Sequence, residues 1–421
     1  VKLENKSRVG STENSYIVTA YSSRSGGTRS FGGWQENDYL GNQTNLTIDK
    51  MWGDVRHTVI VGGEYANEQT DAGGYSATPS SVAVDPYNPD NNAWNGTKTR
   101  SDKQSELELE TISAYVMDTV TLNEDWEVFG GVRYDRFDYQ LDTAERNGRF
   151  GVIPAANYEY DDGFWNGHLG VVYSPWEHGN VYVSWSTSSN INGGEADAAA
   201  SCGYGGLCVD DAGNYAQAEP EQSTNWELGT KWNLLDHRLL LTAAVFQTTK
   251  DDVIEGGNDS YQTGGSLNTG KNRVHGVELG LAGNITDKLS GQIGAAVMDS
   301  ETLKSYDTTN EGLPKANFAE KSANAQLRYQ LTPAFGFGGV VTYSSEIYGG
   351  QPDAGASGNI ELDGYTVYDL FASYRFNEQF DVRANLQNLF DEDYYTAVYR
   401  GGSIVYKGDA RNAQLTARYK F

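Results

Sequence analysis

The chain has 421 residues, a formal net charge of -26 at pH 7 and a mean hydropathy of -0.58. The acidic balance excludes the basic footprint that nucleic-acid binding requires, and no stretch reaches the roughly 18–20 consecutive apolar residues of a membrane helix. Tyr (28), Trp (9) and Gly (49) are nevertheless abundant, whereas Pro (9) and Cys (2) are scarce. This composition suits a soluble all-β protein or a membrane β-barrel, in which a polar inner face lowers the average hydropathy.

Strands are predicted along the whole chain by alternation of apolar and polar residues, beginning at Ser15–Ser23. Between 226 and 234, Trp226, Leu228 and Trp232 share one face and Glu227 and Lys231 share the other. Charges on the second face suit a wet lumen, and the segments have the length of a tilted membrane strand. The same pattern recurs at 323–331, 368–376 and 413–421.

The connections between these strands alternate strictly between short and long. Short turns are expected at 123–125, 175–179, 235–238, 286–288, 332–334 and 377–379. Long polar loops are expected near 24–38, 68–104, 142–163, 189–222, 253–272, 301–318, 345–364 and 389–409. This arrangement is typical of an antiparallel transmembrane β-barrel with short periplasmic turns and long extracellular loops, and we count about sixteen strands.

The two ends of the chain carry further information. The last strand ends with Tyr419 and Phe421 on one face, which resembles the signal read by the machinery that assembles outer-membrane barrels. The sequence begins at Val1 with no charged and apolar leader before it. Either a leader has been cleaved or the chain is a fragment.

Little in the sequence indicates catalysis or metal binding. The five histidines have no nearby partners for a catalytic triad, and no G-x-S-x-G motif occurs. Cys202 and Cys208 lie in a glycine-rich stretch and are expected to form a loop disulfide, because two thiols alone supply too few ligands for zinc. The oxygen-rich segment 85–92 lacks the spacing of a calcium loop and is interpreted as a surface turn. We therefore expect no enzyme activity, no bound metal and no cofactor.

Four blocks, in order and spacing, resemble the TonB-dependent receptors, and in particular the catecholate siderophore receptors. The blocks are Pro220–Trp232, Arg273–Leu279, Leu386–Tyr395 with its Asn388-Leu389-Phe390-Asp391 core, and Gly408–Phe421. Ala410 stands where the family usually has Pro. The Asn388 block is also explained by turn bonding, and strand-end aromatic residues such as Trp126 and Tyr374 by an interfacial girdle.

The resemblance implies a barrel of about twenty-two strands with an N-terminal plug domain. Residues 1–421 would then be the C-terminal part of the barrel, without the plug and the first strands. It also implies an outer-membrane protein that imports a ferric siderophore as cargo, energised by TonB through the missing N-terminal region. Further expected partners are outer-membrane lipid and lipopolysaccharide. The alternative is a passive porin of about sixteen strands, whose interior would be an aqueous channel.

Loop aromatic and cationic residues are the candidates for ligand contact, because ferric siderophores are flat, partly aromatic and often anionic. The expected contacts are Trp94, Arg100, Tyr204, Tyr261, Tyr348, Tyr399 and Arg400. The sequence does not specify which chelate is bound, because loops carry no general code for specificity.

Overall fold

The protein is all-β. A computed structural model describes residues 1–22, 26–79, 81–85, 96–148, 151–153, 155–191, 219–256, 266–350, 356–399 and 404–421. The long strands are β1 (Lys2–Ser22), β2 (Gly27–Trp52), β3 (Val55–Thr78), β6 (Ser105–Thr121), β7 (Trp126–Thr143), β10 (Ala156–Trp176), β11 (Gly179–Asn190), β12 (Glu221–Leu234), β13 (Leu239–Gly256), β14 (Ser266–Asn284), β15 (Leu289–Lys304), β16 (Lys321–Gln330), β17 (Phe335–Ser344), β20 (Tyr365–Arg375), β21 (Phe380–Gln387) and β24 (Asn412–Tyr419).

Short elements decorate the connections between the long strands. They are β4 (Ser81–Ala83), β5 (Thr97–Arg100), β8 (Arg146–Gly148), β9 (Gly151–Ile153), β18 (Ile347–Gly350), β19 (Ala356–Leu362), β22 (Tyr395–Tyr399), β23 (Ile404–Lys407) and the 3₁₀ turn η1 (Thr308–Asn310). Across the described ranges, no helix is both long enough and apolar enough to cross a membrane.

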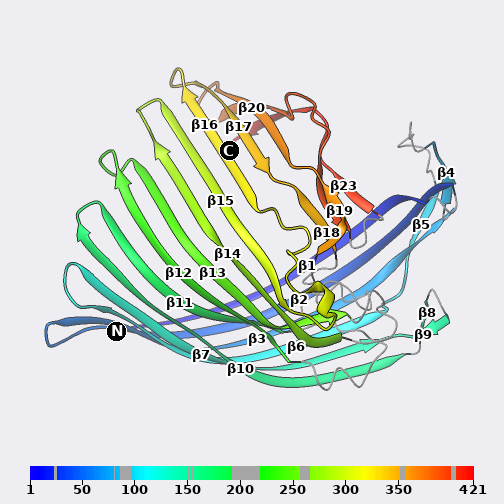
Figure 1. Cartoon of the computed structure of the whole chain (residues 1–421), viewed down its shortest axis with the longest axis horizontal. Helices are drawn as coiled ribbons and strands as arrows, with labels where there is room; N and C mark the ends of the chain where they lie inside the picture. The colour runs from blue at the N-terminus through cyan, green and yellow to red at the C-terminus, as the bar shows by residue number, and fades with distance from the viewer. Residues whose placement is uncertain are drawn as a thin grey trace.

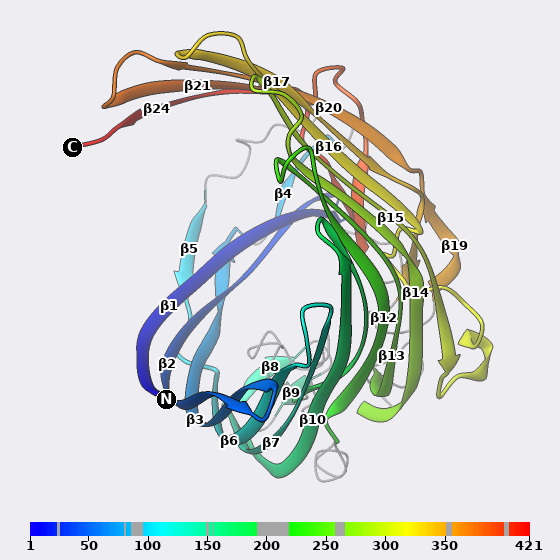
Figure 2. The same cartoon turned by 90° about the vertical axis from the view of Figure 1, so that its left-hand side faces the viewer.

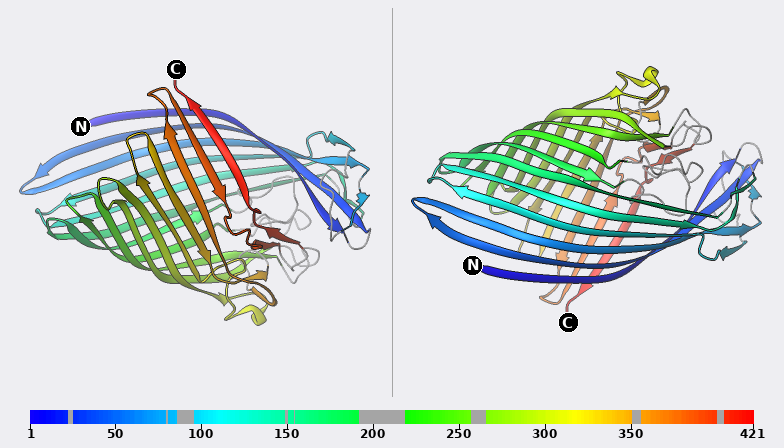
Figure 3. Two further views of the ribbon diagram at one scale, coloured as in Figure 1. Left: turned by 90° about the horizontal axis from the view of Figure 1, so that it is seen from above. Right: turned by 90° about the horizontal axis from the view of Figure 1, so that it is seen from below.

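The main sheet has eighteen strands, of which only β4 and β5 are short, so sixteen long strands form the wall. Each long strand pairs antiparallel with the next long strand along the chain, and Figures 1 and 3 show them lying side by side. The sheet curls around an interior, with β1 at one edge and β24 at the other (Figure 2). In the described residues these two edges do not pair with each other, so the wall is open between them.

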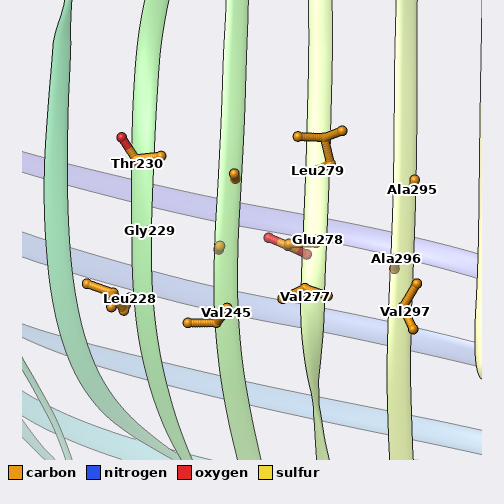
Figure 4. Close-up of a pocket in the computed structure, with 12 residues that line it drawn as sticks. Leu228, Gly229, Thr230, Val245, Val277, Glu278, Leu279, Ala295, Ala296 and Val297 are labelled. Carbon is orange, nitrogen blue, oxygen red and sulfur yellow. The ribbon is translucent and has the colours of Figure 1, made fainter.

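The two faces of the wall differ as the alternation predicts. Leu228, Val245 and Val277 stand opposite one another on β12, β13 and β14, and each is 46–51 % exposed. In the adjacent row, whose side chains have the opposite orientation, Glu278 on β14 (Figure 4) stands opposite Ala244 on β13. Exposed apolar side chains in a continuous band are explained by contact with lipid, and the polar row faces the interior.

The short turns lie at one end of the wall, which we call the turn end, and the long connections at the other, which we call the loop end. At the turn end, single side chains cap the turns. Asn123 accepts from the backbone N–H of Asp125 (2.9 Å), and Asn377 accepts from that of Phe380 (2.8 Å). Thr286 and Thr332 cap their turns in the same way. The six predicted turns are therefore confirmed, and Asx or Ser/Thr bonding explains these four of them.

The N-terminal part of the wall corrects the sequence prediction. The first strand is Lys2–Ser22 rather than Ser15–Ser23, and β2 runs through the segment 24–38 that was predicted to be a long loop. Strands β3, β10 and β14 likewise run into the loops predicted at 68–104, 142–163 and 253–272. The extension of β10 alternates, with Tyr158 and Tyr160 on its inner face, but that of β1 was missed because both of its faces are polar. Opposite Asn14 and Thr12 on one face, for example, Ser11 and Glu13 occupy the other.

Candidate functional site

The loop end gathers the described parts of three connections that are distant in sequence: 305–320, then 345–350 with 356–364, and 388–399 with 404–411. The second contains the β18–β19 hairpin and the third the β22–β23 hairpin. Figure 1 shows β18, β19 and β23 together at this end of the molecule. We call these three connections the loop cluster.

Asn317 holds the loop cluster together. Its backbone N–H donates to the carbonyl oxygen of Tyr348 on β18 (2.8 Å). Its side chain forms a pair of bonds with Val398 on β22: Nδ2 donates to the Val398 carbonyl (2.8 Å) and Oδ1 accepts from the Val398 N–H (2.8 Å). Asn317 adopts a left-handed φ of 54°, which Asn tolerates better than most residues. Val398 is only 1 % exposed, so the contact is dry.

Tyr348 lies in an acidic environment within this cluster. The pKa of its hydroxyl is raised above the ordinary value, first by the charge of Glu361 across the β18–β19 pair, then by burial and by Glu346 and Glu320. The hydroxyl is therefore protonated at neutral pH and available as a hydrogen-bond donor. The surrounding carboxylates favour ligand groups that donate hydrogen bonds or carry positive charge at this point.

The base of the cluster is fixed by Asn388, where β21 ends. The side chain of Asn388 donates to the carbonyls of Glu392 (2.8 Å) and Asp409 (2.9 Å) and accepts from the Glu392 N–H (2.8 Å). Its backbone N–H donates to Asp369 (2.8 Å), and Asp391 accepts from the Arg411 N–H (2.9 Å). The predicted role of this motif in turn bonding is confirmed, because it ties the exit of β21 to the entry of β24.

The inner face near the loop end carries an aromatic cluster that the alternation did not predict. Phe137 and Tyr160 pack edge to face at 5.1 Å, and Tyr139 packs against Tyr160 at the same distance. Leu107, Leu141 and Tyr158 complete the buried group. Each of these rings buries a large apolar area. The inner wall therefore changes from polar to aromatic towards the loop end.

Further towards the turn end the inner face of β3, β6 and β7 is ionic. Arg133 donates to Glu64 (2.9 Å), Asp135 (2.8 Å) and Ser113 (2.7 Å), and Asp135 is 4 % exposed. A buried carboxylate requires this compensation. The nearby ring of Tyr115 lies 5.4 Å from the guanidinium. This network braces the wall, as the buried aromatic cluster does nearer the loop end.

The candidates predicted from sequence fall in three places. Tyr348 lies in the loop cluster, and Tyr399 ends β22 immediately after Val398. Arg100 instead lies on the outer face, where its guanidinium stacks 3.8 Å from the Trp34 ring and forms ion pairs with Glu13 and Glu36. Outside the described residues lie Trp94, Tyr204, Tyr261 and Arg400, together with the expected disulfide cysteines Cys202 and Cys208.

The terminal aromatic pair is placed as expected on the outer edge strand. The rings of Tyr419 and Phe421 pack edge to face at 5.3 Å, and both are exposed. Over the described residues, no group of three or more His, Cys, Asp or Glu side chains could hold a metal ion. A groove of about 450 Å³ lies along β12–β15 in the spanning part of the wall, and not at the loop cluster.

The comparisons with known proteins agree with this geometry. The sequence matches the family described as "TonB dependent receptor-like, beta-barrel" over residues 2–389. A strand wall with an apolar outer band, short turns at one end and long connections at the other defines a protein of the outer membrane. The chain belongs to the TonB-dependent receptor β-barrel family.

Among its relatives is the catecholate siderophore receptor Fiu of Escherichia coli K12, which is 30 % identical over 91 % of this chain and 51 % of its own length. Crystal structures of the siderophore receptor PiuA of Acinetobacter baumannii (TM-score 0.82, 23 % identity) and of Fiu in a closed form (TM-score 0.78, 26 % identity) each cover 100 % of this chain and 62 % of their own. The chain thus spans about half the length of the curated relatives it matches. These relatives are receptors rather than enzymes, and they favour the receptor interpretation over the porin.

Proposed function

We propose that this chain is the barrel part of a TonB-dependent receptor that captures a ferric siderophore at the loop end and passes it through the outer membrane. The observation that carries the proposal is the likeness to the catecholate receptor Fiu over 91 % of the chain. The polar inner face provides a wet route through the membrane, and the loop end provides aromatic and hydroxyl groups above it.

The loop cluster is the proposed capture site. Asn317 holds the hairpins of Tyr348 and Tyr399 together, so that groups from two connections act on one ligand. An aromatic ring can stack on the flat catecholate rings of a ferric chelate, and the protonated Tyr348 hydroxyl can donate to its oxygens. The carboxylates of Glu320, Glu346 and Glu361 oppose an anionic chelate at this point, and Arg400, which follows Tyr399 directly, would offset them with positive charge. Arg100 is not part of the proposal because it lies on the outer face with its charge already paired.

Trp94, Tyr204 and Tyr261 stay in the proposal as loop contacts, with Cys202 and Cys208 as a loop disulfide. The plug domain and the six strands expected before residue 1 would be supplied by the remaining half of the receptor, and TonB would bind there. Tyr419 and Phe421 would be read by the barrel assembly machinery. The apolar outer band would contact lipid and lipopolysaccharide.

The test is binding of a ferric tris-catecholate to the full-length receptor in detergent. Quenching of tryptophan fluorescence measures the binding. We expect saturable binding that is weakened about tenfold or more by Tyr348→Ala, since one aromatic contact contributes about 0.5–1.5 kcal/mol beyond the apolar area it buries. Tyr329→Ala is the matched control, because Tyr329 lies on the outer face at the turn end. Absence of binding, together with steady open pores in a planar bilayer, would favour the porin instead.

A further inference from the structure

Two histidines meet at the turn end of the wall. His178 lies in the turn between β10 and β11, and His237 lies in the turn between β12 and β13. The two turns are separated by fifty-nine positions in sequence, yet the ring centroids are 5.3 Å apart with an interplanar angle of 75°. Both residues are exposed. Within the described part of the chain, no hydrogen bond or ion pair engages either ring, so the ring nitrogens are available.

The backbone of both turns is held by hydrogen bonds, so the two histidines start from fixed positions. The His178 carbonyl accepts from the N–H of Asn233 on β12 (2.7 Å). In the second turn Arg238 donates through Nε to the Leu235 carbonyl (3.1 Å) and through a terminal nitrogen to Asp287 (3.2 Å). The sheet thus fixes the backbone on each side of the pair.

The backbone at His237 is also strained. Leu235, Asp236 and His237 have φ values of 52°, 54° and 63°, three consecutive left-handed residues without a glycine. Each such residue costs of order 1 kcal/mol, and strain of this kind is often kept where it positions a functional group. His237 is the last of these three residues, and its ring contacts the neighbouring turn.

The separation of the rings matches a shared metal ion. With a metal–nitrogen bond of about 2.0–2.1 Å and tetrahedral angles, two imidazoles on one ion have centroids roughly 5 Å apart. Zinc, copper and nickel are the divalent ions that imidazole ligands suit. The rings also lie beyond the aromatic residues Trp176 and Trp232, which pack at 5.2 Å near the membrane boundary, so that they face water.

We propose that His178 and His237 form a two-histidine site for one first-row divalent transition-metal ion, with water completing its coordination. The ion would join the β10–β11 and β12–β13 turns across the intervening strand pair. The site lies at the opposite end of the wall from the loop cluster, and it does not depend on the proposed transport function.

The test is Cu²⁺ binding to the intact protein in detergent, prepared without a polyhistidine tag. Titration should give a tight site of one Cu²⁺ per chain, and the electron paramagnetic resonance spectrum should show coupling to two imidazole nitrogens. His178→Gln and His237→Gln should each weaken that site about tenfold or more, because the second imidazole binds intramolecularly. The double variant should lose the site altogether, because no imidazole remains there.

The matched control is His275→Gln, because His275 lies on β14 with Asp299 as its neighbour at 3.9 Å. Since both turn histidines are exposed, circular dichroism of each variant should show an unchanged strand content. If Cu²⁺ binding and its spectrum are the same in His178→Gln and in the unaltered protein, the contact is edge-to-face packing of two rings and the proposed site is wrong.

Discussion

Asn388 joins three segments of the loop end through a single side chain. It closes the β21 exit with three side-chain hydrogen bonds and is 2 % exposed. Asn388→Ala removes all three bonds. It also leaves an alanine at the left-handed φ of 49°, with no side-chain bond to stabilise that conformation. We expect the free energy of unfolding to fall by roughly 2 to 4 kcal/mol, measured by urea titration in detergent.

Two further replacements at position 388 separate the loss of hydrogen bonds from the backbone strain. Asn388→Asp keeps the acceptor for the Glu392 N–H but loses both donors, and should be intermediate. Asn388→Gly keeps the backbone conformation at no steric cost and should differ from Ala by the strain alone. Equal stability of all three variants and the unaltered protein would mean that the bonds are replaced by water at no cost.

Tyr348 gives a pH-dependent prediction at the same scale. Its pKa is raised from 10.0, with Glu361 the largest cause. The folded state therefore disfavours the ionised phenol, and the contribution of Tyr348 to stability is complete below about pH 10 and is lost as the pH rises through the raised value. Glu361→Gln should lower this pKa more than Glu320→Gln does. ¹³C-tyrosine NMR, with the Tyr348→Phe spectrum to assign the signal, measures both shifts.

These residues also show how far sequence reasoning reaches at this scale. The bonding role of Asn388 was predictable because Asn and Asp have a known local geometry in turns. The role of Asn317 was not predictable, since its partners Tyr348 and Val398 lie 31 and 81 positions away and only the fold brings them together. The same holds for Arg100. From sequence alone, Arg100 is a cation in a predicted loop and therefore a candidate ligand contact. Only the pairing of β3 with β5 shows that it lies on the outer face.

At the scale of elements, Asn317 hydrogen-bonds to both hairpins of the loop cluster. Asn317→Ala removes both side-chain bonds to Val398 and disfavours the left-handed backbone that presents its N–H to Tyr348. We expect faster hydrogen exchange in Tyr395–Tyr399 and in Ile347–Gly350, with little change in β16 and β17. Mass spectrometry of exchanged peptides measures this directly.

The control for this prediction is Asn317→Gly, which keeps the backbone conformation and loses only the side chain. In this variant hydrogen exchange should become faster in the β22–β23 hairpin. Exchange in β18 should stay slow, because the bond from the backbone N–H of residue 317 to the Tyr348 carbonyl remains. Unchanged exchange in both hairpins would show that other contacts hold the cluster.

The strands themselves were predictable where one face meets lipid and not where neither does. In β12 and β16 the apolar row fixes both the phase and the extent of the strand. In β1 and β2 the part beyond the apolar band has polar residues on both faces, and only the pairing of Tyr16 with Gly33 and of Glu13 with Glu36 shows that the strands continue. Strand count was correct because every strand crosses the band once. The predicted strand lengths were wrong because, beyond the apolar band, backbone hydrogen bonding and not side-chain burial determines where a strand ends.

At the scale of the whole molecule, the main consequence of the fold is its two unpaired edges. In the described residues β1 (Lys2–Ser22) pairs only with β2 and β24 (Asn412–Tyr419) only with β21. Each unpaired backbone group in the hydrocarbon region costs several kcal/mol. Edges of this kind recruit other strands. We therefore expect the 421-residue chain alone to sediment in detergent as a mixture of species whose size grows with concentration.

Two introduced cysteines test whether the edge strands β1 and β24 instead lie next to each other. Ser7→Cys and Ala417→Cys lie on the outer face of the two edge strands. If strands from the other half of the receptor fill the gap, the pair should form no intramolecular disulfide in the chain alone or in the full-length protein, and the full-length protein should sediment as a single species. Mass spectrometry distinguishes this disulfide from one between Cys202 and Cys208. A monodisperse chain with a disulfide between positions 7 and 417 would mean that sixteen strands close by themselves, which is the porin geometry and would contradict the half-barrel interpretation.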